Sequence, residues 1–220
     1  MNRPRLVVPR TPPTWDRRVE WTAWDWGAIP ALPPFTLADG SGLAEQQTAA
    51  RVCHDSQALY VRFDCDDRDI WGTFTRRDQP IYDEEVVELF IGAGKADPVR
   101  YFEIELSPNG VLFDAEIYNP TSERRDMVIE VTWNCRRIKW HAERHDEEGL
   151  WWAMLAVPWD AIKPSGPMPT LWRANFYRIE RTRDAVPEFS CWSPTKTEPA
   201  DFHKPAFFGT LELAEVHKKE

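Results

Sequence analysis

Apolar and polar residues alternate at every second position along most of this chain. In residues 101–106 (YFEIEL), Phe102, Ile104 and Leu106 alternate with Glu103 and Glu105. A period of two places neighbouring side chains on opposite faces of an extended strand. Each such segment is therefore predicted to be a strand with one buried face, and the whole chain to be rich in β-structure.

Clusters of Gly, Pro, Asn, Asp and Ser separate these segments and are typical of turns. The pattern predicts roughly nine or ten short strands, with one helical turn at 158–162. The expected strands cover 47–53, 58–65, 86–91, 101–106, 111–118, 127–133, 136–144, 150–157, 171–180 and 207–213. Short strands joined mostly as hairpins favour an antiparallel β-sandwich. We expect one domain over residues 1–220, with an N-terminal arm at 1–42 and a core at 43–213.

The first 40 residues hold seven prolines, which disfavour a long helix or a central strand. Four tryptophans lie in the same arm, Trp15, Trp21, Trp24 and Trp26. We expect them to hold the arm against a sheet by apolar burial. The alternative is that one or two are exposed at a binding face.

Composition narrows the class of protein. The chain has 220 residues and a net charge of −9, so no basic surface is available for a nucleic acid. It has no apolar stretch long enough to span a membrane. The first residues, MNRPRLVVPRTPP, lack the continuous apolar run of a signal peptide, which predicts a cytoplasmic protein. The four cysteines are widely spaced, which favours buried free thiols, and disulfides remain the alternative for an exported protein.

Carboxylates lie where apolar residues would be expected. Glu88 shares a strand face with Val86 and Phe90, so its carboxylate either has a partner or faces a ligand cavity. The partner could be Arg62 or Arg178. A run of aspartates at 64, 66, 67 and 69 is interpreted as a solvated loop, with an oxygen-ligand cation site as the alternative.

Signs of catalysis are weak. The sequence holds no GxSxG, HExxH or glycine-rich phosphate loop. Glu103 with Asp114 or Glu116 could form a glycosidase pair, but the distance between carboxylates decides that mechanism. We therefore expect no enzyme activity and no metal ligands, and no cofactor is firmly predicted.

The order of the motifs resembles the family 9 carbohydrate-binding modules, and more closely their stand-alone, DOMON-like branch. The resemblance covers residues 43–213. It is carried by ALYVRFDCDD, DEEVVELFI, YFEIELSPNGVLFDAEI, WWAMLAVPW, WRANFYRIE, CWSPT and FHKPAFFGTLEL. It implies a jelly-roll-like β-sandwich that binds a mono- or oligosaccharide, or a polysaccharide chain end, between two aromatic side chains. It also implies a link to polysaccharide breakdown, a structural calcium ion in some members, and secretion or a periplasmic location as the alternative compartment.

The resemblance also implies candidate site residues. Tyr82 lies six residues before Glu88 and matches one aromatic clamp, and the second clamp falls at Phe202 and His203. The family's sugar-contacting arginine corresponds to Glu103 here. The expected carbohydrate-binding residues are Tyr82, Glu88, Glu103, Asn175, Tyr177, Arg178, Phe202 and His203.

Two other classes of function stay open at this stage. A protein-interaction or structural β-sandwich would use the same fold without a sugar. DOMON relatives include haem binders, which need axial ligands in one cavity, and Met127, Met154 or Met168 with His203 would have to supply them. The number of subunits cannot be predicted.

Overall fold

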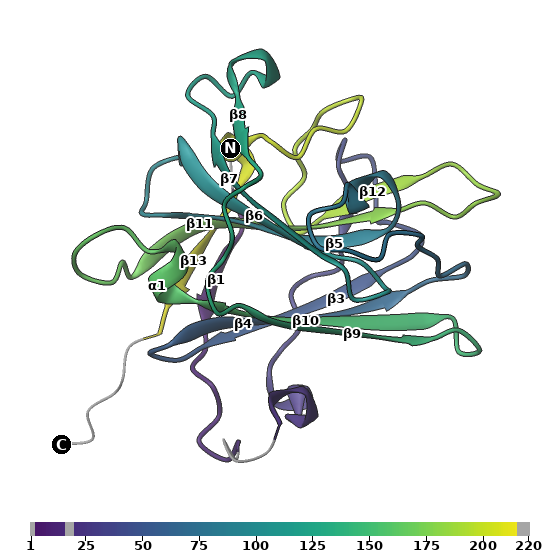
Figure 1. Cartoon of the computed structure of the whole chain (residues 1–220), viewed down its shortest axis with the longest axis horizontal. Coiled ribbons are helices and arrows are strands. Elements are labelled where there is room, and N and C mark those ends of the chain that lie inside the picture. The colour runs from purple at the N-terminus through teal and green to yellow at the C-terminus, as the bar shows by residue number, and fades with distance from the viewer. Residues whose placement is uncertain (1–2, 16–19, 215–220) are drawn as a thin grey trace.

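The computed structural model describes residues 3–15 and 20–214 and consists of two stacked β-sheets with very little helix (Figure 1). The larger sheet has the strand order β1-β13-β11-β5-β6-β7-β8, and β12 joins β11 to β2. The smaller sheet has the order β3-β4-β10-β9. All pairings are antiparallel except the one between β1 and β13. The predicted β-sandwich is confirmed.

The strands of the larger sheet are β1 (Arg5–Val8), β2 (Thr36–Leu37), β5 (Val86–Ala93), β6 (Arg100–Leu106), β7 (Leu112–Tyr118), β8 (Val128–Glu130), β11 (Leu171–Glu180), β12 (Glu188–Cys191) and β13 (Gly209–Leu213). Those of the smaller sheet are β3 (Thr48–His54), β4 (Ala58–Asp66), β9 (Lys139–His145) and β10 (Leu150–Pro158). The helical turns are η1 (Trp21–Ala23), η2 (Trp26–Ala28), η3 (Ile81–Asp83), α1 (Trp159–Ile162), η4 (Arg124–Asp126) and η5 (Pro205–Phe207).

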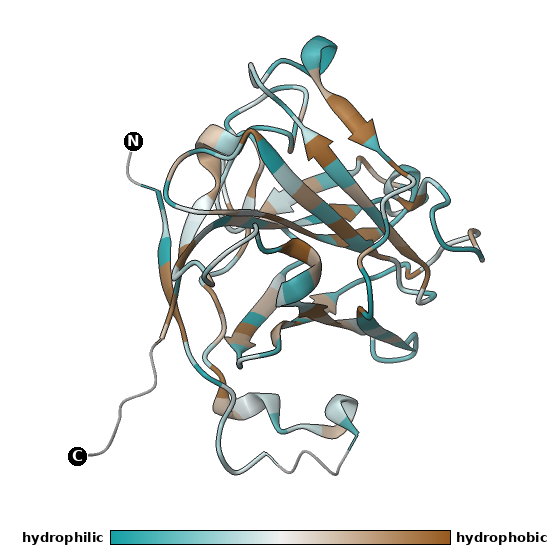
Figure 2. Cartoon of the chain, turned by 60° about the vertical axis from the view of Figure 1, so that its left-hand side comes forward, coloured by the Kyte–Doolittle hydropathy of each residue, from teal (hydrophilic) through white to brown (hydrophobic). Residues whose placement is uncertain are grey.

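The main core lies between the two sheets. Leu89 of β5, Ile104 of β6 and Phe176 of β11 face Val61 and Phe63 of β4 and are fully buried. Each of these strands alternates inward and outward residues, and Figure 2 shows the resulting bands of hydrophobic and hydrophilic positions. Burial of this apolar surface is the dominant stabilising contribution to such a fold.

The outer face of the larger sheet is also covered, which positions the candidate site. Phe90, Tyr101, Phe113 and Tyr177 point outward from β5, β6, β7 and β11, yet they are buried in a second apolar cluster. Loops that follow β7 and β12 lie over this face and contribute Phe202 and other residues to the cluster. A sandwich strand with one solvated face would carry polar residues here. The outer face of the larger sheet is therefore covered by loops and carries apolar side chains.

Most expected strands form within a few residues of their predicted ends. The turn at α1 is confirmed. The strand expected at 127–133 is wrong in extent, because β8 spans only Val128–Glu130 and all three residues are exposed. It pairs with β7 alone at the edge of the sheet, so nothing covers its second side.

The N-terminal tryptophans pack against the smaller sheet, as predicted. Trp15 stacks on Trp24 with ring centroids 4.5 Å apart, and Trp24 meets the edge of Tyr60 on β4 at 5.2 Å. Trp26 is buried in the same cluster. The arm is therefore held to the sandwich by aromatic burial.

The four cysteines are buried free thiols, as expected. Within residues 3–15 and 20–214, no helix has the length and apolar character needed to cross a membrane.

Candidate functional site

A pocket opens on the outer face of the larger sheet, above β5 and β6. Its volume is about 350 Å³, in the range of small-molecule sites. Five aromatic side chains line it, with Ile129, Ile179 and Val131 among the aliphatic ones. The aromatic residues are Tyr82, Phe90, Phe113, Phe189 and Phe202.

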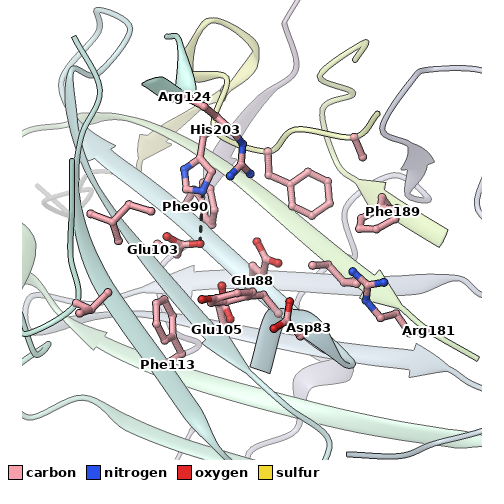
Figure 3. A pocket seen from close by; sticks show the side chains of 16 residues that line it. Asp83, Glu88, Phe90, Glu103, Glu105, Phe113, Arg124, Arg181, Phe189 and His203 are labelled. Atoms are coloured by element: carbon pink, nitrogen blue, oxygen red, sulfur yellow. Dashed lines mark ion pairs between the residues drawn. The ribbon is translucent and has the colours of Figure 1, made fainter. Parts of the chain in front are cut away.

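The strand register sets three glutamates side by side in the pocket. Glu88 of β5 lies directly opposite Glu105 of β6, and Phe90 lies opposite Glu103. The carboxylate oxygens of the three glutamates come within 4.8 Å of one another. Figure 3 shows these side chains pointing into the same space, with Asp83 beside them. Like charges at directly opposite positions destabilise a sheet. The stability of the fold therefore does not explain why the three glutamates lie together.

The glutamates are buried and almost free of partners. Their exposed fractions are 2% for Glu88, 6% for Glu103 and 0% for Glu105. Among the described residues, no donor outside the cluster forms a hydrogen bond with either carboxylate oxygen of Glu105, whose carboxyl pairs with that of Glu103. Burial raises the pKa of Glu88 and Glu105 well above the usual range, and the neighbouring carboxylates raise it further. Burial raises the pKa of Glu103 to about 7, against the effect of Glu105 and Arg124. The cluster therefore retains part of its protons at neutral pH, where ordinary glutamates would be fully ionised.

Cationic side chains lie at the rim rather than among the glutamates. Arg124 lines the pocket, but its guanidinium donates to Asp201 at 3.3 Å. Arg181 lies over the ring of Phe189 at 5.3 Å. Among the described residues, no Arg or Lys forms an ion pair with Glu88, Glu103 or Glu105. The pocket therefore has an acidic floor.

His203 contributes a neutral ring to the wall. Its Nδ1 lies 2.9 Å from the hydroxyl of Tyr101, and its Nε2 lies 3.9 Å from Glu103 Oε1, the contact dashed in Figure 3. Burial, followed by the charge of Arg124, lowers the pKa of His203 to about 4. At neutral pH the ring is uncharged, so it can exchange hydrogen bonds with a ligand but does not neutralise Glu103.

The structure brings five of the eight expected site residues to this pocket. Tyr82, Glu88, Glu103, Phe202 and His203 all line it. Tyr82 is 40% exposed and meets the edge of Phe113 at 5.5 Å, so much of its ring is free for contact. Phe202 is held by stacking on Tyr177, with centroids 4.1 Å apart.

The other three expected residues do not line the pocket. Tyr177 lies beneath Phe202 and donates its hydroxyl to the Phe202 carbonyl at 3.0 Å. The side-chain amide of Asn175 bonds to the backbone of Ser193, donating to its carbonyl and accepting from its N–H. Both residues hold the covering loop in place and are too deeply buried for a ligand.

Arg178 lies on the opposite face of the sheet. Successive residues of a strand point to opposite faces, so Arg178 points between the sheets where Tyr177 points outward. Its guanidinium donates to Asp67 at 3.0 Å and to Glu180 at 2.5 Å. The expected ion pair between Glu88 and either Arg178 or Arg62 does not form, because Arg62 pairs with Asp64.

Other residues that line the pocket were missed in the sequence, Glu105, Arg124 and Phe189 among them. Glu105 shares the face of Glu103 by simple alternation, so the signal for it was present. Arg124 and Phe189 reach the pocket from segments whose course over the sheet no local pattern predicts.

The rival classes find little geometric support. Asp114 and Glu116 lie opposite Ile104 and Phe102 and so point away from the face of Glu103, which separates both expected glycosidase pairs. Of the three methionines considered, Met127 packs beside the outer-face cluster, and the Tyr101 hydroxyl lies 4.0 Å from its sulfur and 2.9 Å from His203 Nδ1. Met154 lies in the N-terminal tryptophan cluster and Met168 is exposed, so neither meets His203 in one cavity. The aspartates near 67 bind arginines: Asp64 pairs with Arg51 and Asp69 with Arg183.

The family model of carbohydrate-binding family 9 matches residues 44–213. The chain belongs to carbohydrate-binding family 9. This is a family of non-catalytic modules, in agreement with the expectation that the protein is not an enzyme.

Relatives of this family 9 protein share its fold at low identity. An extracellular protein of Arthroderma benhamiae is 28% identical over 169 residues, which cover 74% of this chain and 76% of that protein. A provisionally assigned carbohydrate-binding protein from Bacteroides uniformis is 19% identical with a TM-score of 0.75, covering 96% of this chain and 99% of the other. A family 9 module from Caldicellulosiruptor kristjanssonii in complex with cellotriose is 13% identical with a TM-score of 0.63, covering 97% and 95%. A complex of such a module with glucose has a TM-score of 0.61.

Proposed function

We propose that this protein binds a terminal mono- or disaccharide unit non-covalently in the pocket above β5 and β6. The observation that carries the proposal is the combination of aromatic rings and carboxyl groups in one pocket of about 350 Å³. A pyranose offers an apolar C–H face to an aromatic ring and hydroxyls to polar groups at its edge. Glucose and cellotriose are ligands of structurally similar family 9 modules, which supports the choice of ligand class.

In this proposal Tyr82 and Phe202 pack against the sugar ring. Tyr82 is 40% exposed, and Phe202 lines the pocket while its ring stacks on Tyr177. Glu88, Glu103 and Glu105 accept hydrogen bonds from hydroxyls, and a protonated carboxyl can also donate one. His203 adds a neutral ring nitrogen. The link to polysaccharide breakdown remains part of the proposal.

The test is calorimetric titration with glucose, cellobiose and cellotriose. We expect Tyr82→Ala to weaken binding by at least about tenfold, or ~1.4 kcal/mol, because the ring contact is lost. Tyr118→Ala is the matched control, since Tyr118 is 52% exposed at the end of β7 and lies outside the pocket.

Two results would contradict the proposal in different ways. If Tyr82→Ala binds sugar as tightly as the unaltered protein, the site is misassigned although the class of function holds. If no mono- or oligosaccharide binds, the result favours a protein-interaction domain instead.

A further inference from the structure

The acidic floor of the pocket lacks a counter-charge, and this is the feature from which a ligand can be inferred. Glu88, Glu103 and Glu105 are all buried, and among the described residues no donor outside the cluster reaches either oxygen of Glu105. A buried carboxylate is costly unless it is protonated or paired with a cation. The cation is not supplied by the described part of the chain, so it has to be a proton or part of a ligand.

The titratable groups beside the floor supply it with no counter-charge. Burial, and then the charge of Glu105, raises the pKa of the Tyr82 hydroxyl, so this group is neutral at pH 7. Asp83 adds a fourth carboxylate beside the floor. Arg124 is engaged by Asp201, and Lys204 binds the same aspartate at 3.0 Å. Arg181 lies against Phe189, and His203 is neutral at pH 7. The field at the floor is therefore set by the carboxylates.

The geometry of the glutamates suits a primary ammonium group. Three carboxylates converge with oxygens within 4.8 Å of one another, and an ammonium presents three N–H donors around a single nitrogen. Charge-assisted hydrogen bonds of this kind are about twice as strong as neutral ones. Aromatic rings line the rest of the space, and a cation gains further from the faces of such rings.

A divalent metal fits the same lining less well. Ca²⁺ takes about 6–8 oxygen ligands, whereas beyond the carboxylates this pocket is lined by Phe90, Phe113, Phe202 and aliphatic side chains. The lining is that expected for an organic cation with an apolar face.

We propose that the pocket prefers a sugar unit with a free amino group, such as a non-acetylated hexosamine, over the corresponding neutral sugar. The inference rests on the proposed function and names its substrate class. The ammonium would replace the protons shared among Glu88, Glu103 and Glu105, and the pyranose would occupy the aromatic part of the pocket.

The preference has a defined pH dependence. Because the pKa of Glu103 is raised to about 7 and those of its neighbours are also raised, acidification fills the floor with protons. An ammonium then competes with protons and binds less tightly, whereas a neutral sugar does not. The advantage of the amino sugar should therefore grow as the pH rises through 7, until the amine itself loses its charge.

The experiment is calorimetric titration of the full chain with glucosamine, glucose and N-acetylglucosamine at about pH 7, where the amine is still largely charged, and at about pH 5. We expect glucosamine to bind at least about tenfold more tightly than glucose at the higher pH, and the ratio to shrink at the lower pH. N-acetylglucosamine, which has no charge on its nitrogen, should behave like glucose.

Variants separate charge from shape. Glu105→Gln keeps the size of the side chain and should lower the ratio of glucosamine to glucose affinity at about pH 7 by severalfold. Glu103→Gln serves the same purpose if the first variant does not fold. Glu116→Gln is the matched control, because Glu116 binds Arg100 on another part of the sheet, and it should leave the ratio unchanged.

The outcomes distinguish this inference from the function on which it rests. Glucose bound as tightly as glucosamine would overturn the preference and leave sugar binding intact. Failure of every sugar would overturn both. Binding of CaCl₂ alone, with an increase in glucose affinity, would identify the floor as a cation site and also overturn the preference.

Discussion

Two clusters of three buried carboxylates lie on opposite faces of the larger sheet and solve the same electrostatic problem differently. Asp67, Glu85 and Glu180 meet between the sheets, and Arg178 donates to two of them. Glu88, Glu103 and Glu105 meet on the outer face and have no such partner among the described residues. The two clusters have nearly the same composition. They differ because the guanidinium of Arg178 lies in the inner cluster.

Most polar atoms of the inner cluster have a partner, although Glu85 Oε1 and Arg178 Nε have none among the described residues. Asp67 also accepts from the indole of Trp151 at 3.0 Å, and Glu180 accepts from Thr182 at 2.5 Å. Glu85 accepts from the backbone of Trp71 at 3.3 Å, and burial followed by the charges of Asp67 and Glu180 raises its pKa to about 9. A network that is nearly satisfied internally serves the fold. The outer cluster opens into a pocket, so its unsatisfied groups are available to a ligand.

The largest expected effect comes from breaking the inner cluster. Arg178→Met removes the guanidinium and leaves Asp67 and Glu180 buried without a counter-charge. We expect a loss of about 3–5 kcal/mol in the free energy of unfolding. Chemical denaturation measures it. Arg100→Met, which removes a partly exposed partner of Glu116, is the control and should cost about 1 kcal/mol or less.

The outer cluster should respond in the opposite direction. Glu105→Gln removes one of three repelling carboxyls, so it should stabilise the protein at about pH 8 by on the order of 1 kcal/mol. A carboxyl whose pKa is raised on folding contributes stability below its unfolded pKa and loses that contribution as the pH rises through the folded value. The unaltered protein should therefore lose stability between about pH 5 and about pH 8 more steeply than the variant.

Thermal unfolding at several pH values measures this difference. Equal pH profiles for the two proteins would show that Glu105 is compensated by a group outside the described residues. The difference between the two clusters could then not be explained by the lack of a cation beside Glu88, Glu103 and Glu105.

A smaller effect is expected from the support of the pocket wall. Tyr177→Phe keeps the stacking on Phe202 but removes the hydroxyl that donates to its carbonyl. We expect a loss of about 1 kcal/mol in unfolding free energy and a modest fall in sugar affinity. Denaturation and titration of the same sample measure both. An unchanged affinity would mean that the loop around Phe202 is held by its other contacts, such as the amide of Asn119 on the His203 carbonyl at 3.1 Å.

The β-strands were predictable because their signal is local. Alternation in residues 101–106 shows which side of the strand is apolar, and the turn residues mark where it ends. The exception, 127–133, alternates just as well, but it lies at the edge of a sheet where most of it finds no partner. Local pattern reports the capacity of a segment to form a strand, whereas pairing requires a neighbour.

The candidate site was predictable in part. The resemblance to the family implied Tyr82, Glu88 and Glu103 as site residues, and all three line the pocket. Arg178 and Asn175 were grouped with them through their closeness in sequence to Tyr177. In the structure the strand directs Arg178 to the other face, and Asn175 ties down a loop.

The sequence by itself determined the β-rich class, the approximate strands and the presence of carboxylates on apolar strands, because each depends on the chemistry of neighbouring residues. Only the tertiary structure decided which carboxylates meet, and which of the two clusters has an arginine. Strand register and loop course set those distances, and both depend on contacts between residues far apart in the chain. Electrostatic interactions depend steeply on distance and burial, so the chemistry of the pocket became defined only when the sheets assembled.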